Sequence, residues 1–220
     1  MSIQVQGNNG VVAEVSGTTF RALRVELKPL EYGSLGHYRT TVKLVMATTQ
    51  AANSRLFEVR NTHATNLLVL TRCFLMVAPG GTVTTGYLAE FGLWRLTNFS
   101  AVDTTNTVTP TASMKKTTMA AYPGGAAVRH VTIAGAAAGM TGGTLTKDGN
   151  ALASLIAPAF TLAATTPVPS RELVDDTNGT HPLVCGQNEG WEIENVVVGS
   201  GTANVVHVVT DVSWAEVAAI

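Results

Sequence analysis

Short runs in which apolar and polar side chains alternate dominate this sequence, and each run is broken by glycine, proline or asparagine. Alternation with a period of two places the apolar residues on one face of a β-strand, whereas a helix would need a period near 3.6. The runs lie at residues 20–27, 40–48, 56–60, 67–77, 86–99, 191–197 and 206–214. We therefore predict an all-β protein.

About ten such strands without a fixed repeat favour an antiparallel jelly-roll-like sandwich or barrel over a propeller or solenoid. The chain contains 31 threonines, and this β-branched residue suits strands with one wet face. We expect an N-terminal arm or hairpin over residues 1–19, with a turn at Asn8-Asn9-Gly10. Residues 20–220 then form a single jelly-roll-like domain with a loop-rich middle at 101–165.

Two segments depart from simple alternation. Residues 67–77 are apolar at nearly every position, which predicts a central strand covered on both sides. Residues 151–156 are compatible with a short helix that Pro158 would end. The last two runs predict strands in which Trp191, Ile193 and Val197 share one face, and Val206, Val208, Val212 and Trp214 share another.

Charged residues make up only 13% of the chain, and the formal net charge is -1. Such a chain lacks the positive field that collects nucleic-acid phosphates or an anionic membrane surface, so neither is an expected partner. A nearly neutral surface promotes association, and we infer that much of it meets partner subunits. The N-terminus lacks the pattern of a secretory signal, which favours synthesis in the cytoplasm.

No pattern typical of catalysis or of a cofactor is present, and we expect neither an enzyme nor a metal site. The histidines are scattered singly, at positions 37, 63, 130, 181 and 207. Glu192 and Glu194 share a strand face, but neighbouring glutamates of this kind are expected to be solvated or to contact another subunit. Cys73 and Cys185 are predicted to be buried free thiols.

Both ends of the chain carry recognisable blocks. Residues 6–15, with Arg21-Ala22-Leu23-Arg24-Val25 and Pro29-Leu30-Glu31-Tyr32-Gly33, resemble a group of structural proteins from tailed bacteriophages and their prophages. The strands from Phe57 to Phe99 are similar to the same group. So are the closing blocks Pro182-Leu183-Val184, Asn188-Glu189-Gly190-Trp191 and Ser213-Trp214-Ala215-Glu216-Val217.

The resemblance implies a virion component that is made in the host cytoplasm. We expect a decoration or cement protein on the capsid surface, which binds the major capsid protein and copies of itself; trimers would suit three-fold lattice positions. The alternative is a tail-associated or receptor-binding virion protein that recognises a host glycan. The expected partner contacts are Gln4, Gln6, Asn8, Asn9, Val11, Lys115 and Tyr122.

Overall fold

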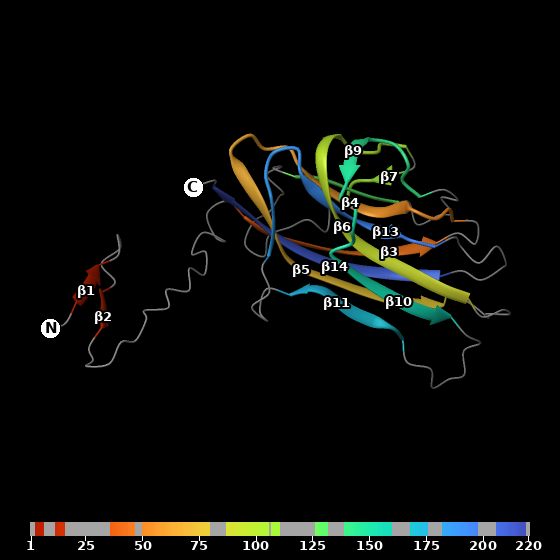
Figure 1. Cartoon of the computed structure of the whole chain (residues 1–220), viewed down its shortest axis with the longest axis horizontal. Helices are drawn as coiled ribbons and strands as arrows, with labels where there is room; N and C mark the ends of the chain where they lie inside the picture. Colours follow the sequence, from red (N-terminus) through yellow and green to blue (C-terminus); the bar gives the residue numbers. More distant parts are fainter. Residues whose placement is uncertain are drawn as a thin grey trace. The chain divides into compact units, whose positions relative to one another are not determined.

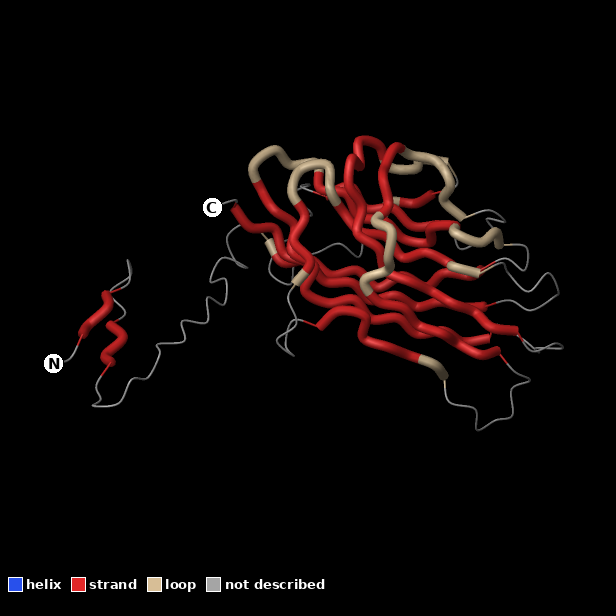
Figure 2. The backbone as a smooth tube through the Cα atoms, in the orientation of Figure 1, coloured by secondary structure: helices blue, strands red, loops and turns tan. Residues whose placement is uncertain are grey.

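The protein is described by a computed structural model in which every regular element is a β-strand (Figures 1 and 2). The structure describes residues 3–6, 12–15, 36–46, 50–79, 87–105, 107–110, 126–131, 139–159, 168–175, 182–197 and 206–218. The chain divides into two compact units, Met1–Leu30 and Glu31–Ile220.

The first unit contains one antiparallel pair, β1 (Ile3–Gln6) and β2 (Val12–Val15). Its register sets Ile3 opposite Val15 and Val5 opposite Ala13, while Gln4 stands opposite Glu14. The fourth pair sets Gln6 opposite Val12, so two of the four pairs are apolar on both strands.

The larger sheet of the second unit has seven described strands, all paired antiparallel. Its order is β10 (Ala153–Ala159), β6 (Tyr87–Ala101), β13 (Gly190–Asn195), β4 (Ser54–Asn61), β8 (Ala126–Val131) and β7 (Thr107–Val108). The seventh, β9 (Thr144–Lys147), pairs with β6 beyond β10.

The smaller sheet has five described strands, also antiparallel. Its order is β11 (Ser170–Asp175), β5 (Asn66–Pro79), β14 (Val206–Ala218) and β3 (His37–Met46), and β12 (Leu183–Cys185) pairs with the same strand β5. The two sheets pack against each other as a β-sandwich, which confirms the all-β sandwich prediction.

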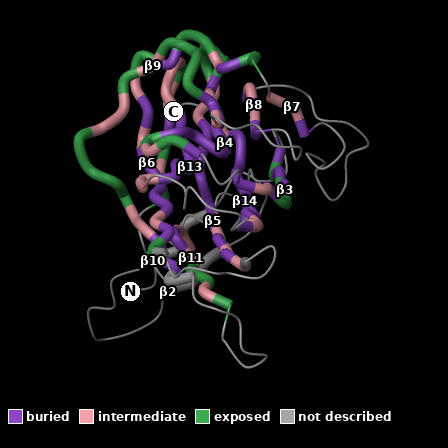
Figure 3. The backbone as a smooth tube through the Cα atoms, turned by 90° about the vertical axis from the view of Figure 1, so that its right-hand side faces the viewer, coloured by how far each residue is buried: buried purple, intermediate pink, exposed green. Residues whose placement is uncertain are grey.

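The core lies between the sheets, and residues of most strands supply it (Figure 3). Strand β3 alternates regularly between exposed and buried positions, as its sequence predicts. On β14, Val206, Val208, Val212 and Trp214 are all buried, and the Trp214 ring stacks on Tyr38 with centroids 5.7 Å apart. Each aromatic side chain of this pair removes a large apolar area from water, so these strands are fixed in register.

Two expectations about individual segments are wrong. Residues 153–159 form strand β10, not a helix, because Ala153, Leu155 and Ala157 alternate inward and pair with β6. Pro158 fits there since β10 is an edge strand, where a missing N–H need not break a ladder. Strand β5 is central in its sheet, but both faces are buried along only part of it, including Leu68, Val69 and Leu70; beyond them Arg72, Phe74 and Met76 are half-buried on one face.

Among the described residues, no helix is long and apolar enough to cross a membrane.

Candidate functional site

Charged side chains form two rows on the face of the larger sheet that points away from the core. In the first row Glu58, Glu192 and Trp94 stand opposite one another on β4, β13 and β6. In the second row Arg55 and Glu194 stand opposite each other, followed by Gly92. The neighbouring residues Phe57, Ile193 and Leu93 point into the core, so the two sets alternate as strand geometry requires.

Glu192 and Glu194 are each only 1% exposed, and the expectation that they would be solvated or subunit-contacting is wrong. The cover comes from residues 139–147, which we call the strap. At one end Met140 pairs with Arg55 of β4, and at the other Thr144–Lys147 pairs with β6. Since β13 lies between β4 and β6, the strap crosses over its two glutamates.

Arg55 attaches the strap to the sheet. Its backbone exchanges two hydrogen bonds with Met140, of 3.2 and 2.9 Å. Its side chain donates through Nε to the Met140 carbonyl at 3.3 Å and through Nη2 to the Gly142 carbonyl. One buried guanidinium therefore binds two carbonyls of a segment that lies more than eighty residues away in the sequence.

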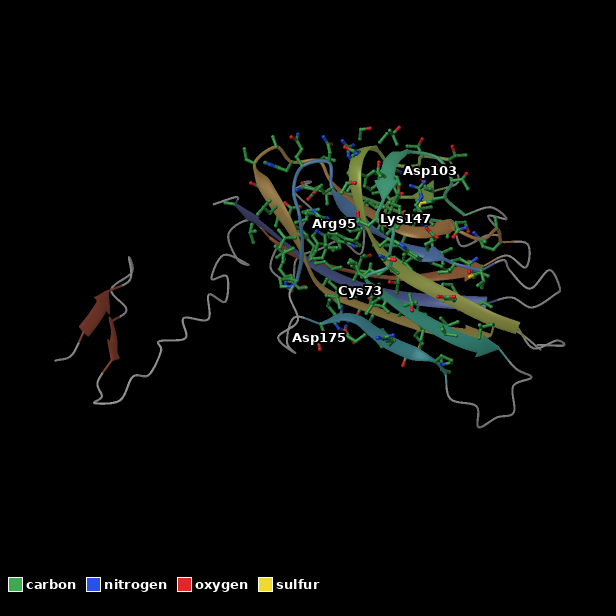
Figure 4. The ribbon with its side chains drawn as sticks, viewed as in Figure 1. Cys73, Arg95, Asp103, Lys147 and Asp175 are labelled. Carbon is green, nitrogen blue, oxygen red and sulfur yellow. The ribbon has the colours of Figure 1, made fainter. Side chains whose placement is uncertain are left out.

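Asp103, in the segment that follows β6, also connects the strap to the larger sheet. Its Oδ2 accepts the Gly142 N–H at 2.6 Å, and its own N–H donates to Glu58 Oε1 at 2.9 Å. Asp103 and Lys147 both lie in the part of the sandwich next to β9 (Figure 4). Carboxylates that accept backbone N–H groups in this way fix loop geometry strongly, because the hydrogen bonds are charge-assisted.

Lys147 joins the strap to β13. Its Nζ lies 2.7 and 2.9 Å from the two carboxylate oxygens of Glu194, and 4.7 Å from the centre of the Trp94 ring. The ammonium thus satisfies one buried carboxylate and rests over an aromatic face. Gly92 makes this arrangement possible, because the Trp94 indole occupies the space that a side chain at position 92 would need.

Glu192 belongs to this group of Arg55, Glu58, Asp103, Lys147, Glu192 and Glu194, which we call the charged cluster, and one of its carboxylate oxygens is unsatisfied among the described residues. Burial, and secondarily its hydrogen bond with Glu194, raise the pKa of Glu192 to about 8, although Arg55 acts in the opposite direction. Its Oε2 has no hydrogen-bond partner among the described residues and lies 3.7 Å from Arg55 Nε. Burial also raises the pKa of Glu58, and Arg55 and the Asp103 N–H offset part of that effect.

A pocket of about 300 Å³ lies beside the charged cluster. It is lined by residues of the strap and of the sheet: Asn53, Arg55, Met140, Thr141, Gly142, Gly143, Leu145, Lys147, Glu192 and Glu194. The lining combines carboxylates, cations and amide or hydroxyl groups, so both donors and acceptors face the pocket. Within the described part of the chain, no group of three or more histidine, cysteine or acidic side chains could hold a metal ion.

A second polar cluster lies on the smaller sheet. Asp211 of β14 accepts hydrogen bonds from Arg39 Nε at 2.8 Å, Thr41 at 3.1 Å and Arg72 at 2.5 Å. Arg72 also pairs with Glu172 of β11 at 2.5 Å. These side chains come from β11, β5, β14 and β3, which lie side by side in that order. The network therefore connects all four of these strands of the smaller sheet.

The residues predicted as partner contacts are only partly placed by the structure. Gln4 and Gln6 lie on β1. The other five, Asn8, Asn9, Val11, Lys115 and Tyr122, lie outside the described residues. The cysteine prediction is confirmed: Cys73 and Cys185 are buried and free, and burial raises the pKa of each thiol to about 12.

Sequence reasoning missed Arg55, Asp103 and Lys147 as partners of the two glutamates. One usable signal was present, since Arg55 and Glu58 are charged residues on either side of the apolar pair Leu56-Phe57 in a strand. Charged residues in such positions are almost never fully buried without a partner of opposite sign. That partner could not be located, because the strap has no periodic pattern that would tie it to β4.

Comparison with family models, with curated proteins and with solved structures gave no match for this chain.

Proposed function

We propose that this chain is a structural virion protein, a decoration or cement protein that binds and stabilises a phage head shell through subunit contacts. The observation that carries the proposal is the N-terminal ribbon, a compact unit of its own in which Ile3 pairs with Val15 and Val5 pairs with Ala13. An isolated two-stranded ribbon is marginally stable in water. Burying these apolar pairs on a partner subunit would supply the stability that the ribbon itself lacks.

The strand pairing of the sandwich supports a jelly roll as the scaffold. Strand β3 pairs with β14, and β4 pairs with β13. Strand β5 pairs with both β12 and β11, and β6 pairs with β10. The chain is thus a long double ribbon whose successive pairs belong alternately to the smaller and the larger sheet. A ribbon rolled up in this way is the jelly-roll arrangement, which is common among capsid domains.

The sandwich also offers a surface suited to contacts. Leu88 of β6 and Ile156 of the edge strand β10 are 51% and 53% exposed, and Leu152 beside them is 50% exposed. Large apolar side chains grouped on one surface mark interaction sites more often than scattered ones do. Many copies of a modest interface on a symmetric shell would act together through avidity.

The test uses heads purified from particles made without this protein. Removing residues 2–15 should abolish binding to those heads and their stabilisation against heat. Val5→Asp, which places a charge in an apolar pair of the ladder, should weaken binding by more than about tenfold. Gln4→Asp adds the same charge to a pair that is already polar and should change binding by less than about threefold. Full binding by the truncated protein would rule out attachment through the ribbon.

A tail-associated or receptor-binding protein is the second candidate, and the pocket beside the charged cluster favours it. Its volume of about 300 Å³ is at the small end of ligand sites, and its mixed donors and acceptors suit the hydroxyl groups of one sugar residue. Specific hits on a glycan array, lost in Lys147→Ala, would support this candidate. An array without hits, together with binding to heads, would support the decoration protein.

A further inference from the structure

One guanidinium in the charged cluster faces acceptors on both the strap and the sheet. Its Nη1 lies 3.1 Å from Glu58 Oε2 of the same strand, and the competition concerns its other nitrogens. Arg55 Nε donates to the Met140 carbonyl at 3.3 Å, a long hydrogen bond, and lies 3.7 Å from Glu192 Oε2. The same side chain also donates to the Gly142 carbonyl. A small rotation of Arg55 toward Glu192 would therefore exchange a contact with the strap for a contact with the sheet.

The surroundings of Glu192 supply few other donors. Glu194 on the same strand is already bound by Lys147 from β9 through both carboxylate oxygens. Asp103 gives its N–H to Glu58, and Trp94 in the same row is uncharged. The charged groups that face this part of the sheet are Glu194 from β13, Arg55 and Glu58 from β4, Lys147 from β9, Asp103 after β6, and Arg129 from β8, which acts on Glu58.

The balance between the two acceptors depends on the charge of Glu192. While its carboxyl group is neutral, the hydrogen bond with Glu194 satisfies it, and Arg55 is free to bind the strap carbonyls. Once it is ionised, a buried carboxylate with an unpartnered oxygen faces a second carboxylate. A hydrogen bond from Arg55 to that charge is roughly twice as strong as one to a neutral carbonyl.

We propose that Arg55 and Glu192 form a pH-operated latch for the strap. With Glu192 neutral, Arg55 holds the carbonyls of Met140 and Gly142; with Glu192 ionised, Arg55 turns to the carboxylate, and residues 139–147 loosen over β13. The latch does not depend on the proposed function. Because the pocket is formed between the strap and the sheet, the same step opens the pocket.

Burial and the neighbouring Glu194 place the pKa of Glu192 at about 8, so the latch should operate between neutral and mildly alkaline pH. Amide hydrogen exchange of the full-length protein, corrected for the intrinsic effect of pH, measures it at residue level. Protection of the Met140 and Gly142 amides should fall by at least about tenfold between about pH 6.5 and pH 9. The core amide of Ile193 should keep its protection over the same range.

The variant Glu192→Gln keeps the shape and the hydrogen-bonding capacity of the side chain but cannot ionise. Its strap should stay protected at both pH values. Glu189→Gln is the matched control, because Glu189 pairs with Arg95 outside the pocket lining, and it should respond to pH as the wild type does. Equal strap protection of the wild type at both pH values would overturn the latch, and so would a pH response that survives in Glu192→Gln.

A measurement on the unmodified protein keeps the proposal testable even if Glu192→Gln does not fold. The side-chain carboxyl carbon of Glu192, followed by NMR, should titrate in the same pH range as the loss of strap protection. Titration near the ordinary value of 4.5, with no change at higher pH, would refute the latch.

Discussion

Gly92 lies beside the indole of Trp94 so closely that a Cβ at position 92 would overlap the ring carbons Cζ3 and Cη2. The two residues are on the same face of β6, and the space left by the glycine is filled by the ring that supports Lys147. The charged cluster thus depends on an uncharged residue that has no side chain of its own.

Gly92→Ala should destabilise the protein by about 1–3 kcal/mol, because the added methyl group must displace a buried ring. Chemical denaturation followed by tryptophan fluorescence measures the change. Gly149→Ala is the control, since a Cβ there meets nothing within 4 Å, and it should stay within about 0.5 kcal/mol of the wild type. Equal effects of the two substitutions would show that Trp94 is not fixed against Gly92.

Asp211 should make the protein sensitive to acid. Burial alone would raise its pKa, but the hydrogen bond and charge of Arg39, with Thr41 and Arg72, outweigh burial and hold the pKa of Asp211 below 3.8. Its folded-state pKa is therefore lower than its unfolded value, so the stabilisation is complete above pH 3.8 and is lost as pH falls through the folded value.

The variant Asp211→Asn tests this expectation. It should be less stable than the wild type by about 1–3 kcal/mol at neutral pH, and the difference should shrink as the pH falls below about 3.8. Urea denaturation at a series of pH values measures it. A difference between Asp211→Asn and the wild type that stays constant over this pH range would contradict the expectation.

The exposed apolar group on β6 and β10 should act in contacts rather than in folding. Ile156→Asp is expected to reduce self-association or binding to heads while changing the free energy of unfolding by less than about 1 kcal/mol. Analytical ultracentrifugation and co-sedimentation with heads measure the two contacts. Val184→Asp on β12, which is 41% exposed on the smaller sheet, is the matched control. Equal losses of self-association and of binding to heads in both variants would show that Ile156 has no specific role.

Cys73 and Cys185 should be inert toward thiol reagents while the protein is folded. Burial raises the pKa of each thiol to about 12, and Cys73 and Cys185 are both 0% exposed. At pH 8 we expect labelling by an aromatic disulfide only at the rate of unfolding, and complete labelling in denaturant. Rapid labelling of one thiol in the native protein would show that its strand opens locally.

The sequence was most informative where alternation was regular. The strands that end at Met46 and that begin at Val206 follow from period-two patterns, because one buried face fixes both the element and its register. Residues 153–159 show the limit of this reasoning. A short segment rich in alanine and leucine suits a helix or an edge strand, and pairing with β6 decides between them.

The charged cluster could not be predicted for a different reason. Alternation correctly set Glu192 and Glu194 on one face of β13, but it does not say whether that face meets water. The answer depends on Lys147 and Met140, which are brought to the site by irregular backbone. Long-range contacts made by a segment without periodicity cannot be predicted from a local sequence pattern.

The place of β13 and β14 in the sheets has a consequence for synthesis. Each is the strand that joins the two halves of its sheet, β13 between β4 and β6 and β14 between β3 and β5, yet both are encoded after residue 189. A nascent chain therefore carries strands from both halves of each sheet without the strand that joins them until this region has been translated. The sandwich cannot close before this region has left the ribosome tunnel, and a product that ends before residue 189 would lack the joining strand of both sheets.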